Sequence, residues 1–211
     1  MMKIKICGVT NYDDAVLATN AGADYIGFNF VKESPRKVSE KLVKTVVEKL
    51  PPFVSAVGVF VNEDPSVVAK CAKKCGLKLI QLHGDETPEY CRDISARTGL
   101  PVIKAFRVAD EQTIAGLAAY AGAAHYFLLD AYAPDAPGGT GVAFNWDLAV
   151  KAKECGTPVF LAGGLTPENV AEAVAKVMPF AVDVASGVER LPRRKDYDRL
   201  SQFVRRARGL K

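Results

Sequence analysis

Short apolar runs alternate with longer amphipathic stretches from one end of the chain to the other. Each run is rich in β-branched residues and is bounded by polar residues, glycine or proline, which is typical of a buried β-strand. The pattern predicts strands over residues 3–9, 25–30, 55–61, 79–83, 102–106, 126–130, 159–162 and 181–185.

Between these runs, apolar positions recur at three- and four-residue spacing, which is the period of a helix with one buried face. The pattern predicts helices over residues 12–20, 40–50, 65–74, 88–97, 111–120, 146–154, 167–176 and 197–208. A capping residue followed by proline marks three of the starts, at Asp64-Pro65, Thr87-Pro88 and Thr166-Pro167. Glycines at positions 76, 99 and 156 mark helix ends.

The regular alternation of strand and helix predicts the architecture. Strands that are joined through helices by short connections run parallel, and eight of them is the number that closes a (β/α)8 barrel. We therefore expect an α/β fold with a single TIM-barrel domain over residues 1–211. The alternative is an open, doubly wound sheet with fewer strands, which leaves some of the predicted strands without a place.

Composition and charge narrow the function classes. Apolar residues make up 49% of the 211 and charged residues 25%, so the chain can build a large core. A net charge of +4 suits an anionic small molecule, but it fits a solvated surface equally well. Nucleic acid is not expected as a partner, because no helix carries a basic stripe interleaved with aromatic residues. The basic runs at 193–195 and 205–206 are interpreted as solvated faces.

Five cysteines, an odd number without a Cys-x-x-Cys pair, indicate free thiols in a reducing compartment. No histidine pair stands near them to complete a zinc site, so no metal is expected. The chain has no apolar run long enough to cross a membrane and no apparent signal peptide. We therefore expect a cytoplasmic protein without a membrane partner, either monomeric or homodimeric.

Chemistry in such a barrel is carried by the carboxyl ends of the strands and the loops that follow them. Cys7 ends the first predicted strand, and alternation along that strand places it on the barrel interior together with Lys5. A thiol there can be a base or nucleophile, or simply a small buried residue. Asp130 ends the sixth strand, where a carboxylate after an apolar run is costly to bury unless it is used or paired.

Further polar side chains end other strands. Gln81 and His83 share a direction on the fourth strand, so both are expected to point inward, with His83 either functional or structural. His125 precedes a strand at the opposite end of the barrel and is expected to be structural. In the second loop, Arg36 follows a rigid proline, and its guanidinium suits a carboxylate or phosphate unless it is a plain surface residue.

Glycines in the seventh and eighth loops predict a phosphate site. Gly163 and Gly164 follow the seventh strand, and Asp183, Ser186 and Gly187 belong to the segment that closes the eighth. Barrels often hold phosphate at these two loops with backbone amides and the start of a short helix. The alternative is a pair of tight turns without a ligand. The long sixth loop, residues 131–143, is also glycine-rich and is either a lid or a flexible connector.

Taken together, these segments resemble the phosphoribosylanthranilate isomerases of tryptophan biosynthesis over nearly the whole chain. Each motif alone is weak, but the ordered set is specific. The motifs are KICGVT at 5–10, SPR at 34–36, GVFVN at 58–62, QLHGD at 81–85, GGTG at 138–141, LAGGL at 161–165 with PENV at 167–170, and SGVE at 186–189.

The resemblance implies an Amadori rearrangement of N-(5-phosphoribosyl)anthranilate without a cofactor. It implies Cys7 as general base, Asp130 as general acid and Arg36 as the residue that holds the anthranilate carboxylate. It also implies a phosphate site at the seventh and eighth loops. We expect Gln81, His83, Gly163, Gly164, Asp183, Ser186 and Gly187 to complete substrate binding.

Such chemistry needs Asp130 protonated and Cys7 ionised, against reference pKa values of about 3.9 and 8.5. Lys5 is expected to depress the pKa of Cys7. Two departures from the family pattern are Ala185, where serine is common, and Asn145, where aspartate is usual.

Two other hypotheses about the function remain. One is a metal-dependent barrel acting on another phosphosugar, such as a pentose-phosphate epimerase, which usually places histidine and aspartate ligands at the strand ends. The chain has only two histidines, one at the wrong end. The other is a non-catalytic phosphate-binding scaffold, which needs neither Cys7 nor Asp130.

Overall fold

Eight parallel strands close into a barrel in which each strand pairs with the next along the chain and β8 pairs with β1. The computed structural model describes residues 1–131 and 146–210. The strands are β1 (Lys3–Ile6), β2 (Tyr25–Asn29), β3 (Ser55–Phe60), β4 (Leu79–Leu82), β5 (Val102–Val108), β6 (Tyr126–Ala131), β7 (Val159–Leu161) and β8 (Ala181–Val184). The (β/α)8 TIM barrel predicted from the alternation is confirmed.

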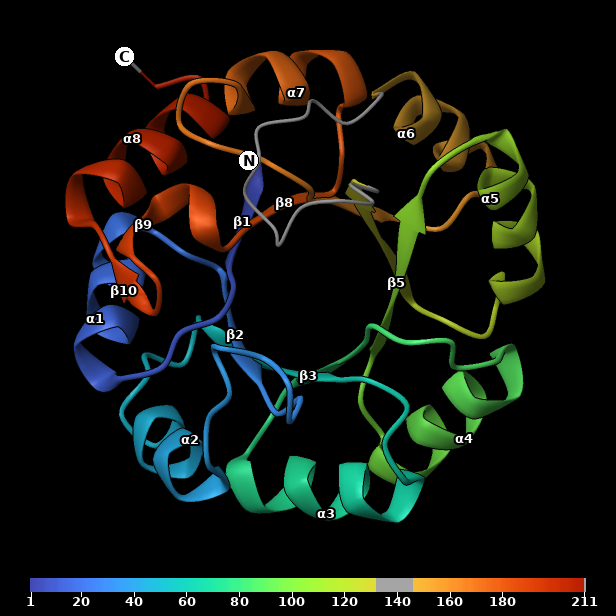
Figure 1. Cartoon of the computed structure of the whole chain (residues 1–211), viewed down its shortest axis with the longest axis horizontal. Helices are drawn as coiled ribbons and strands as arrows, with labels where there is room; N and C mark the ends of the chain where they lie inside the picture. The colour runs from blue at the N-terminus through green and yellow to red at the C-terminus, as the bar shows by residue number, and fades with distance from the viewer. Residues whose placement is uncertain (132–145, 211) are drawn as a thin grey trace.

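Helices form a ring around this barrel, as the view down its axis shows (Figure 1). They are α1 (Tyr12–Ala21), α2 (Glu40–Val47), α3 (Pro65–Cys75), α4 (Pro88–Thr98), α5 (Glu111–Gly116), α6 (Trp146–Ala152), α7 (Val170–Val177) and α8 (Tyr197–Ala207). Two of the predicted helices change to 3-10 geometry before they end, α5 into η1 (Leu117–Tyr120) and α6 into η2 (Lys153–Cys155).

Local capping chemistry explains where most of these helices begin and end. Asp64 and Thr87 accept hydrogen bonds from backbone N–H groups of the first helical turn, each before a proline, as predicted. Gly76, Gly99 and Gly156 follow their helices with positive φ, which side chains other than glycine rarely adopt. Because these capping signals lie within a few residues of the helix ends, they could be recognised in the sequence.

One predicted helix start is wrong. Thr166-Pro167 opens a turn, and α7 begins only at Val170. Side chains of this turn accept hydrogen bonds from its backbone. Asn169 Oδ1 accepts from the N–H of Thr166, and Thr166 Oγ1 accepts from the N–H of Glu168. These short-range bonds compete with helical ones and delay the helix by three residues.

The apolar core has two layers, which follow from the alternation of side chains along each strand. The larger layer lies between the strands and the helices and includes Ile4, Ile6 and Phe127. The smaller layer fills the barrel interior around Leu128 and Phe160. Because Ile4 and Ile6 face the helices, Lys5 and Cys7 point to the barrel interior, as the pattern predicted.

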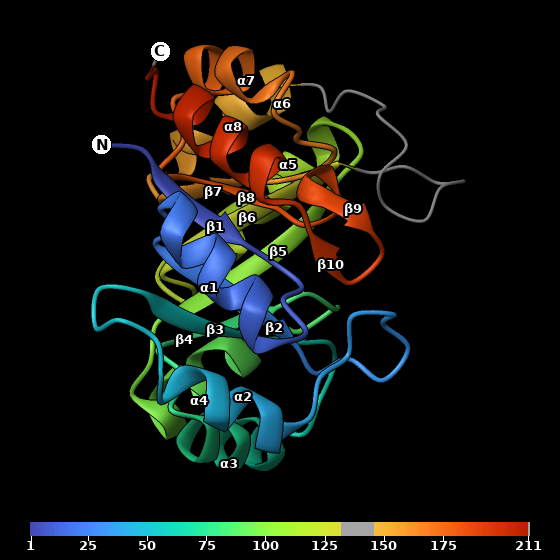
Figure 2. The same cartoon turned by 90° about the vertical axis from the view of Figure 1, so that its left-hand side faces the viewer.

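An antiparallel hairpin that the sequence pattern did not predict follows η3 (Ser186–Val188). Its strands are β9 (Glu189–Leu191) and β10 (Arg194–Lys195). In the side view the hairpin and the loop after β2 lie at one end of the barrel, and the N-terminus lies at the other (Figure 2). Lys195 is buried, so the interpretation of residues 193–195 as a solvated face is wrong for this lysine, although Arg193 and Arg194 are exposed.

Three further observations concern predictions made from the sequence. His125 is structural, because its Nδ1 accepts from the N–H of Val102. The glycine-rich segment 138–141 and Asn145 lie outside the described residues. Among the described helices, none is long and apolar enough to cross a membrane.

Candidate active site

A cavity of about 210 Å³ opens at the carboxyl ends of the strands. All ten site residues expected from the sequence line it, contributed by β4, β6 and β8 and by the loops after β1, β2, β4, β7 and β8. Its lining consists of Cys7, Gly8, Asn29, Arg36, Val59, Gln81, His83, Asp130, Ala162, Gly163, Gly164, Leu165, Asp183, Val184, Ala185, Ser186 and Gly187.

Cys7 directly follows β1, and its backbone N–H donates to the carbonyl of Val184 at 2.8 Å, so the main chain is still held by β8. The chain then turns at Gly8, which has a φ of 72°. A Cβ at Gly27 on β2 would lie 2.8 Å from the Cys7 sulfur. Glycine at this position therefore makes room for the thiol at the rim of the cavity.

Buried charges surround this thiol. Lys5 is fully buried and donates from Nζ to Asp183 Oδ1 at 2.8 Å, across the register that pairs the two residues on β1 and β8. Burial raises the pKa of Cys7, Lys5 lowers it and Asp183 raises it, and the net result lies above the usual thiol range. Lys5 acts in the predicted direction, but the expected net depression of the pKa is wrong, because burial outweighs the lysine.

Asp130 faces His83 across the cavity. The Nε2 atom of His83 lies 3.5 Å from Asp130 Oδ2, and the other ring nitrogen lies 2.9 Å from the amide nitrogen of Gln81. The amide nitrogen of Gln81 donates, so His83 Nδ1 accepts, and Nε2 is the ring nitrogen that directs a proton toward Asp130. Gln81 and His83 therefore point inward, as predicted, and form a polar chain that ends at the carboxylate.

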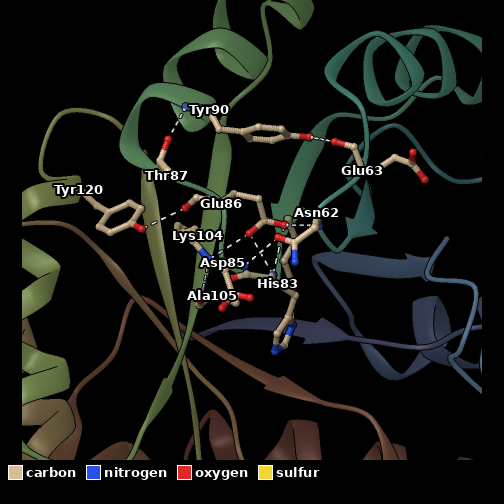
Figure 3. Close-up of polar contacts among 12 residues, drawn as sticks. Asn62, Glu63, His83, Asp85, Glu86, Thr87, Tyr90, Lys104, Ala105 and Tyr120 are labelled. Carbon is tan, nitrogen blue, oxygen red and sulfur yellow. Dashed lines mark hydrogen bonds and ion pairs between the residues drawn. The ribbon is translucent and has the colours of Figure 1, made fainter.

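A buried ion pair holds the loop that carries His83 (Figure 3). Glu86 accepts from the N–H groups of Asn62 and Gly84, and its Oε2 lies 3.1 Å from Lys104 Nζ. Lys104 in turn donates to the carbonyl of Gly84 at 2.7 Å. Through this pair, the loops after β3 and β4 are fixed to β5, and the backbone next to His83 has little freedom.

Arg36 reaches the cavity from the loop after β2. Its Nε and Nη2 atoms donate to both carboxylate oxygens of Glu189, at 2.8 and 2.7 Å, in a bidentate pair. A Cβ at Gly8 would lie 2.3 Å from Arg36 Cδ, so glycine at this position lets the arginine pass close to the main chain that follows Cys7. Arg36 is thus an oriented cation in the cavity wall.

The loops after β7 and β8 form one continuous backbone surface. Gly163 and Gly164 have φ values of 82° and 69°, which favour glycine. A Cβ at Gly187 would lie 2.0 Å from the carbonyl oxygen of Leu165, so the two loops are packed too closely for any side chain there. In the part of the chain that the structure describes, the N–H groups of Gly163, Gly164, Ser186 and Gly187 have no acceptor, and they remain available to an anion.

Three residues of this region escaped the sequence reasoning. Asn29 ends β2 and lines the cavity, and the strand-end rule that selected Gln81 would also have found it. Glu189 and Lys195 belong to the unpredicted hairpin. Glu189 ends the motif SGVE but was assigned no role, and Lys195 stands in a charged run, which normally marks a surface. No group of three or more metal-ligating side chains occurs among residues 1–131 and 146–210.

A closed (β/α)8 barrel with a thiol, a carboxylate and a guanidinium around one cavity at the carboxyl ends of its strands defines a barrel enzyme. Residues 4–206 match the family described as N-(5'-phosphoribosyl)anthranilate (PRA) isomerase. An N-(5'-phosphoribosyl)anthranilate isomerase of Geobacter sulfurreducens is 52% identical over 209 residues, 99% of this chain and all of that protein. The chain therefore belongs to the phosphoribosylanthranilate isomerase family of tryptophan biosynthesis.

Solved structures agree with this membership. The crystal structure of the phosphoribosylanthranilate isomerase of Thermotoga maritima is 42% identical, with a TM-score of 0.94 and full coverage of both chains. A second isomerase structure, in complex with reduced 1-(o-carboxyphenylamino)-1-deoxyribulose 5-phosphate, is 40% identical, with a TM-score of 0.89 and full coverage of both chains.

Proposed function

We propose that the chain converts N-(5'-phosphoribosyl)anthranilate to 1-(2-carboxyphenylamino)-1-deoxyribulose 5-phosphate, with Cys7 as general base and Asp130 as general acid. The observation that supports the two roles is that both side chains line the same cavity, Cys7 directly after β1 and Asp130 on β6. The bound ligand of one relative is a reduced form of this product, which supports the choice of substrate for this chain.

The first step is opening of the ribose ring. Asp130 gives its proton to the ring oxygen while the bond between that oxygen and C1 breaks, and the anthranilate nitrogen supplies an electron pair to form the C1–N double bond. The ring oxygen leaves as a hydroxyl group, and the intermediate is a protonated imine. The Nε2 proton of His83, directed at Asp130, then stabilises the carboxylate that remains.

The second step is proton loss from C2. The thiolate of Cys7 takes this proton, the electron pair forms the C1–C2 double bond, and the imine nitrogen becomes neutral. The resulting enolamine becomes the product when its C2 hydroxyl proton is lost and C1 gains a proton. Only protons are transferred in this sequence, so the proposed reaction calls for one acid and one base and no redox or metal cofactor.

Two anchors hold the substrate at its ends. Arg36 keeps donor capacity beyond its pair with Glu189 and binds the anthranilate carboxylate. The free amides around Gly163, Gly164, Ser186 and Gly187 bind the phosphate, as glycine loops after the seventh and eighth strands do in many barrels. Gln81, His83 and Asp183 contact the ribose portion between these anchors.

In solution we expect the chain to work as a single barrel domain over residues 1–211, as a monomer or a homodimer. We also expect it in the cytoplasm, since all five cysteines are free thiols.

A turnover assay tests the proposal. Freshly prepared N-(5'-phosphoribosyl)anthranilate is fluorescent, and its conversion removes the anthranilate fluorescence in proportion to enzyme. Loss of fluorescence at the same rate with and without a strong chelator is expected, with the rearranged product identified by chromatography. An enzyme that leaves the substrate unchanged, or that stops when the chelator is added, would contradict it.

A further inference from the structure

The hairpin β9–β10 places two opposite charges next to the catalytic cavity. Glu189 opens β9 and Lys195 closes β10, and the strand register sets the two residues opposite each other. The hairpin is fixed to the first loop of the barrel, because Thr10 Oγ1 donates to the carbonyl of Arg193 at 3.0 Å. Neither charge was part of the site expected from the sequence, and the proposed reaction assigns neither a role.

The side chain of Lys195 is inaccessible to solvent, and its ammonium group is fully hydrogen-bonded within the protein. Its Nζ donates to the carbonyl of Cys7 at 2.7 Å, to the carbonyl of Ala185 at 2.8 Å and to Glu189 Oε1 at 3.0 Å. These three acceptors use all the hydrogens of an ammonium group. The lysine therefore joins the main chain after β1 to the main chain after β8.

Glu189 links this lysine to Arg36. Its side chain is 4% exposed, and it accepts both donors of the bidentate arginine pair besides the lysine bond. Burial alone would raise the pKa of Glu189, but hydrogen bonds from Arg36 and the charge of Lys195 outweigh it and lower the pKa. The carboxylate is therefore ionised, and one unbroken chain of contacts runs from Cys7 through Lys195 and Glu189 to Arg36.

A buried ion network is an inefficient way to stabilise a fold, because desolvation of the charges offsets most of their attraction. What such a network does well is to fix groups in space and to set the local field. Here the groups at its two ends are the thiol and the guanidinium that face the cavity. The charged groups around the thiol are Lys5 on β1, Asp183 on β8, Lys195 on β10 and Arg36 from the loop after β2.

We propose that Glu189 and Lys195 are positioning residues for the isomerase reaction. Glu189 orients Arg36 for the substrate carboxylate, and Lys195 fixes the backbone of Cys7 and supplies positive charge that favours its thiolate. This inference rests on the roles proposed above for Cys7 and Arg36. It assigns the hairpin, which is no part of the barrel itself, a function in both substrate binding and proton abstraction.

Kinetic constants separate the two roles. Glu189→Gln keeps the shape of the side chain but removes one charged acceptor from Arg36. It is expected to raise KM about tenfold or more, as the loss of a charged hydrogen bond does, with a much smaller effect on kcat. Glu189→Asp, which keeps the charge, should recover part of this loss. Arg194→Met, an exposed neighbour on the same hairpin, is the matched control and should behave as the wild type.

Thiol reactivity tests Lys195 without turnover. In a Cys155→Ser background, which removes the other partly exposed cysteine, the rate of alkylation at Cys7 is followed against pH by peptide mass spectrometry. Lys195→Met should move this profile to higher pH relative to the Arg194→Met control. This measurement remains readable even if the proposed substrate is not turned over, so failure of the two proposals can be told apart.

Folding is checked for every variant by circular dichroism and thermal melting. If Lys195→Met alone does not fold, the double variant with Glu189→Gln, in which neither charge is left unpaired, is compared with Glu189→Gln alone. A Cys7 profile in folded lysine variants that matches the control, or a KM in Glu189→Gln equal to that of the wild type, would overturn the corresponding role.

Discussion

Lys5 Nζ stands 2.8 Å from Asp183 Oδ1, and this pair shares the barrel interior with the thiol of Cys7. The lysine side chain is completely buried and that of the aspartate is one-tenth exposed, so each is the nearest compensating charge of the other. The pairing is determined by the strand register, which sets Lys5 on β1 beside Asp183 on β8. It does not depend on the flexibility of the two side chains. The contribution of this pair to the electrostatic field at the thiol is therefore set by the barrel itself.

Breaking this pair should cost both stability and reactivity. Lys5→Met leaves Asp183 as an unpaired buried charge, and we expect a loss of about 3–5 kcal/mol in the free energy of unfolding, measured with urea. The double variant Lys5→Met/Asp183→Asn should be more stable than Lys5→Met alone. Lys3→Met, at a half-exposed position on the same strand, is the control. A loss in Lys5→Met no larger than in this control would show that the pair is not coupled.

Removal of the acid or the base should reduce turnover without changing the fold. Cys7→Ser and Asp130→Asn are each expected to lower kcat by about 10² or more, the usual contribution of a positioned acid or base. Steady-state kinetics on variants with wild-type melting curves measure the effect. Turnover near the wild-type level in either variant would exclude that residue from its role.

The pH dependence follows from the raised pKa of Cys7. The reactive form of the base is the thiolate, whose fraction grows as pH rises. In Asp130→Asn, where no carboxyl group titrates at position 130, kcat/KM should therefore increase with pH and continue to rise above the ordinary thiol range. The same shift has the opposite sign for stability. The neutral thiol is favoured in the fold, so its contribution is present at low pH and is lost as pH rises through the folded pKa. An alkaline limb that is unchanged in Cys7→Ser would argue against the thiol as its source.

Arg36 should act mainly in binding. Arg36→Met removes the guanidinium that we assign to the anthranilate carboxylate, and the expected result is a higher KM with a smaller change in kcat. Product inhibition by an analogue without the carboxylate gives a second measurement, because such an analogue should bind the wild type and the variant equally. If KM is unchanged in a folded Arg36→Met protein, the carboxylate is held elsewhere.

The contact between Gly187 and Leu165 makes a steric prediction. Any Cβ at position 187 would overlap the carbonyl of Leu165, so Gly187→Ala must push the two phosphate-binding loops apart. We expect KM to rise about tenfold or more, with competitive inhibition by inorganic phosphate weakened in parallel. Gly116→Ala is the control, because nothing lies within 4 Å of a Cβ there. Equal phosphate affinity in the two variants would contradict the packing argument.

Local patterns predicted most of the fold, because the hydrophobic period, the helix caps and the glycines at helix ends each act over a few residues. The strand-end rule also selected Cys7, Gln81 and Asp130, because a parallel barrel brings all carboxyl ends of its strands to one mouth. The start of α7 was missed for an equally local reason, the competing side-chain bonds of Thr166 and Asn169. Recognition of that turn would have required weighing two alternative sets of bonds for the same backbone.

From the sequence alone, the barrel, the family and ten of the residues that line the cavity could be predicted, because strand ends, caps and motifs are short-range features repeated along the chain. The arrangement of the charges, in contrast, follows from the three-dimensional fold. Arg36 and Glu189 are 153 residues apart in the chain and share a bidentate pair, and Lys195 is buried against the carbonyl of Cys7. The pKa of Cys7 likewise depends on burial and on charges brought by β8 and β10. Electrostatics at a site is a sum over neighbours in space, and no pattern along the chain reports which neighbours those are.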